Sequence, residues 1–462
     1  MKYIITIFVF SCFFISCKKD SFITSADARL STSVDSLKFD TVFTTTGSIT
    51  KSFKIFNNNE QKLLLSKIKL GGGATSAFKM NVNGIATSEL NNVEVAANDS
   101  IYVFVTVTVN PTTANLPFII SDSVLINFNG KNAKVNLEAF GQNANFIRNG
   151  LIVGNVNFTN ALPYVILGGL QVASTGTLTI NAGTKIYCHA DAPLIIDGTL
   201  ICNGTKLQPI VFAGDRLDDP YNGFPASWPG IYFTSTSKDN VLQFTSVKNA
   251  YQAVVVDAPA TNANPKLLLK QCIIDNAFDA GLLFTNTKVA AENCLVSNCG
   301  RAVDASYGGN YSFIHCTFAS YSNNYVLHKK PSIFLTDANG NNQTSPLNTL
   351  LQNCIVYGDA GFVQNEIQTT KVGGSFVVNI DHCLYRSVTD PTNATINVSI
   401  KNIDPSFDSV DNSRRIYDFR ITKNATAAGI NKGVATAPLL LKDLDDKNRN
   451  IGLPDIGAYE KP

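Results

Sequence analysis

Three short stretches decide the fold of this chain: QCIIDN at 271–276, NCLVSN at 293–298 and HCTFAS at 315–320. Their cysteines, Cys272, Cys294 and Cys316, lie 22 residues apart, and each precedes a short apolar run and a turn. A fixed period near 22 residues that carries one strand and one turn is typical of a solenoid, in which each coil covers the one before it. The period therefore predicts a β-solenoid.

The cysteine position continues into further coils. Thr245 occupies it 27 residues before Cys272, and Cys354 and Cys383 follow at intervals of 38 and 29 residues. We interpret the longer gaps as inserted loops, such as residues 328–350. Matching side chains of successive coils stack about 4.8 Å apart, so we expect these cysteines to form a buried ladder of small apolar side chains. Disulfides between coils and a metal site are the alternatives, but stacked strands hold thiols parallel, and paired CxxC or His spacing is missing.

A second ladder follows the first in register. Asn249, Asn276 and Asn298 each lie four residues after the cysteine position. Asparagine tolerates a left-handed backbone and bonds locally, so it suits a tight turn between two faces of a coil. Together the ladders predict a single-stranded parallel β-helix over residues 143–400. The coils resemble those of right-handed parallel β-helix proteins, and the handedness is implied by that resemblance.

Residues 29–142 show a different, all-β pattern. Isoleucine or valine occupies every second position from Ile101 to Val109. This alternation predicts a strand with one face toward the interior of the domain. Short alternating strands with regular turns predict an Ig-like β-sandwich. The stretches SLKFDTVF, SFKIFNNN and VNLEAFGQ resemble Ig-like modules of the abnormal-spindle/hydin type, which implies a spacer or a binding scaffold.

The N-terminus has the features of a targeting segment. Lys2 precedes the apolar run IITIFVFSCFFIS, which is too short to span a bilayer. The stretch from Phe14 to Cys17 resembles a bacterial lipobox, although Phe14 replaces the usual Leu. The resemblance implies a signal peptide at 1–16, lipidation of Cys17, a tether at 17–28 and a lipid anchor in the outer membrane. Lys18-Lys19-Asp20 resembles surface-export signals of Bacteroidetes lipoproteins. An ordinary secretory signal or an uncleaved anchor are the alternatives.

The C-terminus carries the most specific motif. Asp404-Pro405-Ser406-Phe407 opens a segment that ends in PDIGAYE, from Pro454 to Glu460. This segment closely resembles the end of bacterial choice-of-anchor Q proteins. The resemblance implies a cell-surface protein without specifying a reaction. We expect residues 401–462 to act as a cap, since the end of a solenoid exposes strand edges.

The loop GDRLDDPYNGFPASWPG at 214–230 is the best candidate ligand site. Its carboxylates, arginine and aromatic rings suit hydrogen bonding to a glycan and stacking on it. The candidate glycan contacts are Arg216, Asp218, Asp219, Tyr221 and Trp228. Trp228 has an alternative role in packing, because the stretch WPGI resembles a coil start in which a tryptophan covers a turn.

Composition and motifs favour a binding role over catalysis. The net charge is +2, so the charge does not indicate binding to nucleic acid. The Asp218-Asp219 pair lacks the companion motifs of polygalacturonase-like hydrolases. His315 and His382 precede inward cysteines, so alternation predicts that they face solvent.

We therefore predict surface display, adhesion or binding of a polysaccharide, with no assigned catalytic residue, cofactor or metal. The alternative is a glycoside hydrolase or a polysaccharide lyase, and a role for Ca²⁺ or another cation belongs only to the lyase. Its site would lie in the loop at 214–230 or on the coils from Asp275 to Asp304.

Overall fold

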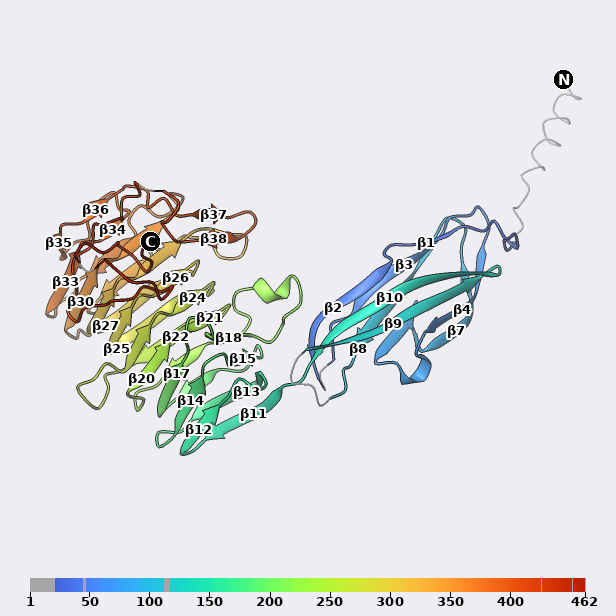
Figure 1. Ribbon diagram of the computed structural model, residues 1–462, viewed down its shortest axis with the longest axis horizontal. Helices are drawn as coiled ribbons and strands as arrows, with labels where there is room; N and C mark the ends of the chain where they lie inside the picture. The colour runs from blue at the N-terminus through green and yellow to red at the C-terminus, as the bar shows by residue number, and fades with distance from the viewer. Residues whose placement is uncertain (1–20, 45–46, 112–116, 425, 451, 462) are drawn as a thin grey trace, which may run out of the picture. The chain divides into compact units, whose positions relative to one another are not determined.

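The structure is a computed structural model of the 462-residue chain. It describes residues 21–44, 47–111, 117–424, 426–450 and 452–461. The chain divides into two compact units, Met1–Asn143 and Ala144–Pro462, and both consist mainly of strands (Figure 1). The all-β prediction is therefore confirmed. Within these ranges no helix is long and apolar enough to cross a membrane. The apolar run and Cys17 lie outside the described residues.

Two five-stranded sheets enclose the core of the first unit. Their strand orders are β1-β3-β8-β5-β6 and β2-β10-β9-β4-β7. Strand β8 alternates as expected, because Val103 and Val105 lie in the shared core while Tyr102 and Phe104 face outward. The strands are β1 (Leu30–Thr32), β2 (Ser36–Phe43), β3 (Lys51–Asn57), β4 (Leu63–Leu70), β5 (Phe78–Val82), β6 (Ile85–Thr87), β7 (Glu89–Val95), β8 (Ser100–Val107), β9 (Phe118–Phe128) and β10 (Lys131–Gln142).

The second unit is a winding parallel sheet of 26 strands, β11 to β36 (Figure 1). Strands one coil apart pair in parallel, for example β24 with β26 and β26 with β28, which is the arrangement of a solenoid. Its first strands are β11 (Asn145–Ile152), β12 (Asn155–Phe158), β13 (Tyr164–Val172), β14 (Thr177–Asn181), β15 (Lys185–Cys188), β16 (Leu194–Ile196), β17 (Thr199–Asn203), β18 (Ile210–Gly214), β19 (Ile231–Phe233), β20 (Asn240–Gln243), β21 (Thr245–Lys248), β22 (Gln252–Asp257) and β23 (Leu267–Lys270).

The later coils continue this sheet and lead into a short antiparallel hairpin, β37 with β38. The remaining strands are β24 (Ile273–Asp275), β25 (Ala280–Glu292), β26 (Leu295–Ser297), β27 (Val303–Ile314), β28 (Thr317–Ser320), β29 (Ile333–Thr336), β30 (Leu347–Gln352), β31 (Ile355–Gly358), β32 (Ile367–Thr370), β33 (Phe376–Asp381), β34 (Leu384–Tyr385), β35 (Thr395–Asn397), β36 (Ile400–Lys401), β37 (Ser409–Asp411) and β38 (Ile416–Asp418).

The cysteine ladder lies inside the solenoid. Its thiols donate hydrogen bonds to backbone carbonyls, such as Cys272 Sγ to the oxygen of Leu242 at 3.1 Å and Cys354 Sγ to that of Phe313 at 3.3 Å. The buried-thiol interpretation therefore holds over the disulfide alternative. The described cysteines, all free and buried, are Cys188, Cys202, Cys272, Cys294, Cys299, Cys316, Cys354 and Cys383.

A left-handed residue precedes each ladder position, and a left-handed asparagine follows the first three ladder strands. The residue before the cysteine has a positive φ, as in Gln271 at 52° and Asn293 at 52°. The ladder asparagines have one too, with φ of 61° at Asn249, 58° at Asn276 and 52° at Asn298. The expectation that these asparagines form tight turns is confirmed, since asparagine adopts this backbone at low cost.

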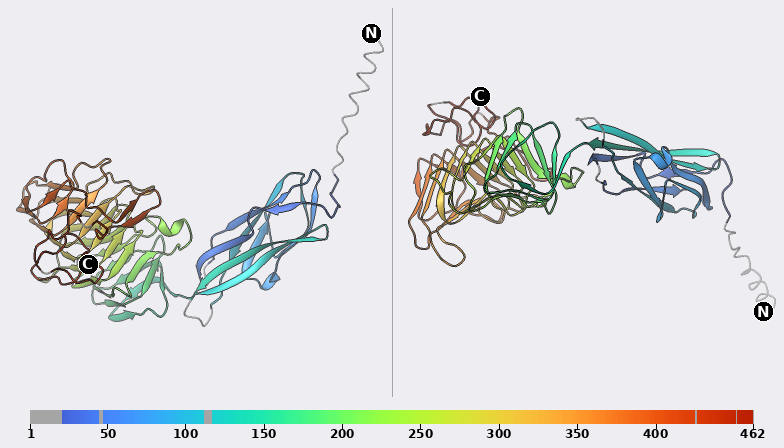
Figure 2. Two further views of the ribbon diagram at one scale, coloured as in Figure 1. Left: turned by 45° about the horizontal axis from the view of Figure 1, so that its top comes forward. Right: turned by 90° about the horizontal axis from the view of Figure 1, so that it is seen from below.

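Residues 403–461 cover a side of the solenoid, which differs from the end cap that the sequence suggests (Figure 2). The outward residues Ile273 and Leu295 pack in one cluster with Phe419, Leu444 and Tyr459. In a second cluster, the outward residues Ile355 and Leu384 pack against Ile421, Ala427 and Ile456 of this segment. The apolar residues that follow four of the five ladder cysteines are therefore outward and covered, because they need a partner outside the coil.

Arg449 fixes this lateral segment to the coils. Its guanidinium is buried and donates to Glu460 Oε2 at 3.1 Å and to Asn293 Oδ1 at 2.8 Å. Asn293 is a corner residue of the solenoid, so one side chain joins the chain end to a coil. The same segment covers His315, which is only 1% exposed. The expectation that His315 faces solvent is wrong, because residues of the lateral segment pack over this side chain.

Replacement of Arg449 by Met should lower the free energy of unfolding by about 3–5 kcal/mol, because Glu460 would remain buried without its partner. Chemical denaturation of residues 21–462 measures this loss. Lys401→Met, which breaks an exposed pair with Asp390, is the control and should cost less than about 1 kcal/mol. Equal effects of the two variants would contradict the anchoring role of Arg449.

The ladder thiols should resist alkylation in the folded protein, since burial excludes the reagent and disfavours the thiolate. Burial raises the pKa of the ladder thiols Cys272, Cys316 and Cys354. Hydrogen bonds from the neighbouring thiols lower the pKa of Cys294, whose protection therefore depends on burial alone. Mass spectrometry of residues 21–462 after iodoacetamide treatment should find all eight cysteines unlabelled when folded and labelled when denatured. Cysteines that stay unlabelled in denaturant until reduced would reveal disulfides and contradict the free ladder.

Candidate functional site

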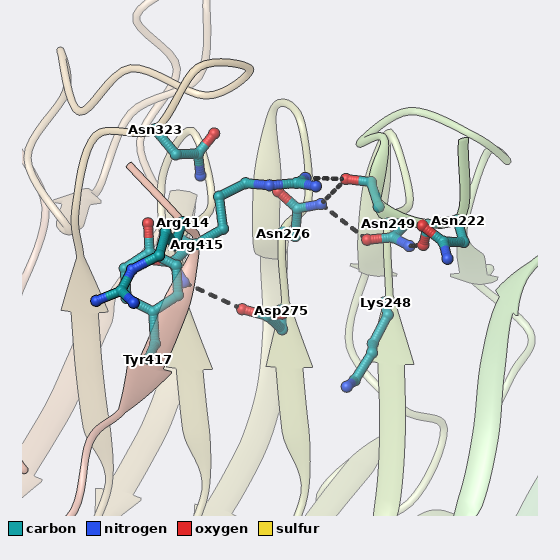
Figure 3. A pocket seen from close by; sticks show the side chains of 11 residues that line it. Asn222, Lys248, Asn249, Asp275, Asn276, Asn323, Arg414, Arg415 and Tyr417 are labelled. Carbon is teal, nitrogen blue, oxygen red and sulfur yellow. Dashed lines mark hydrogen bonds between the residues drawn. The ribbon is translucent and has the colours of Figure 1, made fainter. Parts of the chain in front are cut away.

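A polar cavity of about 280 Å³ opens at the corner where the ladder asparagines stack, and we call this region the asparagine corner (Figure 3). Three segments build it: the turns of successive coils, the loop at 214–230 and the hairpin of β37 and β38. The lining residues are Asn222, Gly223, Lys248, Asn249, Asp275, Asn276, Asn298, Asn323, Arg414, Arg415 and Tyr417.

Side-chain amides connect the coils to the loop. Asn276 Nδ2 donates to Asn249 Oδ1 at 2.8 Å and to the carbonyl of Gly223 at 3.0 Å. Asn249 Nδ2 donates to the carbonyl of Asn222 at 2.8 Å. The left-handed turns repeat at each coil, so they project these amides in one row. The row of amides therefore offers fixed donors and acceptors that do not titrate.

Asp275 supplies a carboxylate at the base of the cavity. Its Oδ1 accepts hydrogen bonds from Ser297 Oγ at 2.7 Å and from Asn298 Nδ2 at 3.4 Å (Figure 3). Lys248 is its register partner in the preceding coil. The carboxylate is partly accessible from the cavity, yet protein surrounds it, and burial raises the pKa of Asp275 against the opposing effects of Ser297 and Lys248.

The hairpin brings Arg415 across the cavity. Arg415 Nη1 donates to the carbonyl of Gly223 at 2.9 Å, and the guanidinium lies over the ring of Tyr325, 4.8 Å from its centroid. Figure 3 shows this side chain reaching toward Asn276. Tyr417 forms part of the wall, and burial together with the charge of Asp275 raises its pKa. The raised pKa favours the protonated phenol of Tyr417.

Four of the five candidate contacts from the loop lie together, but they differ in accessibility. Arg216 forms a two-point pair with Asp218, at 2.8 and 2.9 Å, and stacks on Tyr221 at 3.9 Å. Tyr221 is 41% exposed and Asp219 is exposed, whereas Asp218 is buried. The accessible members of the predicted patch are therefore Arg216, Asp219 and Tyr221.

Trp228 does not belong to an accessible surface. It is 1% exposed, its ring lies beside Phe212, and its Nε1 donates to the carbonyl of Lys248 at 2.8 Å. The prediction of a glycan contact at Trp228 is corrected, because the indole is buried in the solenoid core and its one polar group is already bonded. The packing alternative accounts for this residue.

Aromatic rings link the predicted patch to the cavity. Phe224 contacts Tyr221 and Tyr325, with ring centroids 5.1 and 4.8 Å apart. Arg216 stacks on one end of this row and Arg415 on the other. The loop at 214–230 thus contributes to the site mainly through residues 221–224.

Two further exposed aromatic residues follow the asparagines of the corner in the chain. Tyr251 and Phe278 each follow a ladder asparagine by two residues and are 45% and 50% exposed. Their rings stack with centroids 5.9 Å apart. The repeated pattern Asn-Ala-aromatic in NAY and NAF is the sequence signal that could have identified them. No local signal points to Arg415 or Tyr417, because the fold brings them to the corner from far along the chain.

In the ranges that the structure describes, no group of three or more His, Cys, Asp or Glu side chains could hold a metal ion.

Comparisons with known proteins add little. No protein-family model matches the chain, and no curated protein matches it. One solved structure, described as "The details of glycolipid glycan hydrolysis by the structural analysis of a family 123 glycoside hydrolase from Clostridium perfringens", matches with a TM-score of 0.19 and 10% identity. The match covers 24% of this chain and 26% of that one, and a likeness of this extent carries no argument.

The pKa of Asp275 predicts a pH-dependent stability. Because burial raises this pKa, protonated Asp275 stabilises the fold, and this contribution is lost as pH rises through the folded-state pKa. The free energy of unfolding of the wild type, relative to Asp275→Asn, should therefore decline from pH 4 to pH 7 in denaturant titrations. Asp411 is the control, since its hydrogen bonds lower its pKa. The difference in the free energy of unfolding between the wild type and Asp411→Asn should instead shrink as pH falls below about 4. A flat profile for Asp275→Asn would contradict the raised pKa.

Proposed function

We propose that this protein binds a glycan at the asparagine corner. The observation that carries the proposal is a cavity lined by stacked amides and flanked by exposed aromatic rings. Amides offer both donors and acceptors to sugar hydroxyl groups, and aromatic faces cover the apolar side of a sugar ring. Tyr221, Tyr251 and Phe278 provide such faces next to the polar groups.

Binding fits the corner better than cleavage of the glycan. Hydrolysis by the common mechanism needs two carboxyl groups on either side of the scissile bond. The described residues that line the cavity include one carboxylate, Asp275. Tyr417 is a poor candidate base, since its raised pKa disfavours the phenolate. Glycan cleavage therefore remains an outcome of the test below.

The proposal also includes a location at the cell envelope. The apolar N-terminal run and Cys17 support lipid anchoring, and the resemblance of the C-terminal segment to choice-of-anchor Q proteins supports surface display. In this proposal the first unit, Ig-like in its expected fold, acts as a spacer that carries the solenoid. Labelling of cells with radioactive palmitate and loss of the label in Cys17→Ala would test the anchor.

A glycan array and affinity electrophoresis in polysaccharide gels, both with residues 21–462, test the binding. The double variant Tyr251→Ala/Phe278→Ala should bind a retained glycan about 5- to 150-fold more weakly, because it loses two ring contacts of about 0.5–1.5 kcal/mol each. Phe362→Ala, which removes a 69% exposed ring elsewhere on the solenoid, is the matched control and should bind normally.

Three results would contradict this proposal. They are the absence of binding to every glycan, unchanged binding by the double variant, or new reducing or unsaturated ends in the incubated polysaccharide. The last result would show that the protein cleaves the polysaccharide.

A further inference from the structure

We infer that the asparagine corner selects glycans that carry an anionic group, either the carboxylate of a uronic acid or a sulfate ester, and that Arg415 recognises this group. The inference rests on the proposed glycan binding and names the class of ligand. It comes from the charge and contacts of one side chain in the cavity.

Arg415 differs from its neighbours in having no carboxylate partner among the described residues. Seven arginines occur between residues 200 and 461. The other six form ion pairs, which are Arg216–Asp218, Arg301–Asp304, Arg386–Glu366, Arg414–Asp411, Arg420–Asp445 and Arg449–Glu460. A half-buried guanidinium without a counter-charge is costly, so an anionic ligand would stabilise it.

The contacts of Arg415 leave most of its donors unused. A guanidinium has five N–H groups in a fixed planar fork, and one hydrogen bond, from Nη1 to the carbonyl of Gly223, involves this side chain in the described structure. Arginine binds carboxylates and similar oxyanions through two parallel hydrogen bonds. Arg415 therefore has the capacity for such a contact while it keeps its bond to Gly223.

The surroundings hold the guanidinium in place before a ligand arrives. Its plane lies over Tyr325, and a β-carbon added at Gly223 would lie 2.8 Å from Nη1 and 2.9 Å from Nη2. Glycine at 223 thus allows the approach of Arg415. Lys248 adds a second positive charge to the lining, whereas Asp275 favours its neutral form more than an ordinary carboxyl group does. Such a site pays little ordering cost on binding.

The experiment compares three probes on residues 21–462: oligogalacturonate, its carboxyl-reduced neutral form and a sulfated galactan oligosaccharide. Calorimetry should give an affinity for at least one anionic probe that exceeds the neutral one by about tenfold or more. Arg415→Gln should abolish this preference. Arg415→Lys should retain only part of it, because lysine keeps the charge but loses the fork. The comparison of the two anionic probes identifies the carboxylate or the sulfate as the recognised group.

Two further variants separate recognition from general charge and folding. Gly223→Ala should weaken anionic binding by displacing Arg415, while its thermal unfolding stays cooperative. Arg148→Gln removes an exposed arginine elsewhere on the solenoid and should change nothing.

Equal affinity for the neutral and anionic probes, unchanged in Arg415→Gln, would overturn the inference and leave glycan binding intact. Failure of every glycan, including those of the array, would overturn both proposals.

Discussion

The solenoid and its cavity depend on the parallel stacking of the ladder strands in register, in which a left-handed residue precedes every ladder position and a left-handed asparagine follows the first three strands. The register places a cysteine inside, an apolar residue outside and an asparagine at the turn, coil after coil. Because the backbone fixes the direction of each side chain, three different chemical rows arise from one repeat. The inner row forms the core, the outer row needs a cover, and the turn row provides amides for a cavity.

The outer row connects the repeat to the site. Its apolar residues are covered by the segment 403–461, and Arg449 joins the end of that segment to the corner residue Asn293. The same segment carries the hairpin that brings Arg415 to the carbonyl of Gly223. The cavity thus exists because a segment that packs for hydrophobic reasons also delivers charged side chains to the asparagine corner. Covering the coils and building the site are parts of one arrangement.

The repeat was predictable from the sequence, whereas the site was predictable only in part. Cys272, Cys294 and Asn276 recur at a fixed spacing, and parallel stacking turns that spacing into position. The loop at 214–230 was identified from composition, and Tyr221 is accessible, but Trp228 is buried because large apolar area favours the core. Arg415 lies 192 residues from Gly223. Inserted loops of variable length decide which segments meet, so spacing could not indicate that contact.

His315 shows the same limit on a smaller scale. Alternation along a strand predicts an outward side chain, and the side chain does leave the coil. A left-handed corner and the lateral segment then bury it, and burial together with the charge of Arg449 lowers its pKa well below the ordinary value. Local periodicity describes the direction of a side chain, and long-range packing determines its environment.

The central claim is that the asparagine corner is a glycan-binding site. A crystal structure of residues 21–462 with a saturating oligosaccharide, cut from the polysaccharide that the protein retains most strongly, tests it most directly. We expect a sugar in the cavity, with hydroxyl groups bonded to the ladder amides and a ring face against Tyr251, Phe278 or Tyr221. A sugar bound elsewhere on the protein, with the corner empty, would contradict the account.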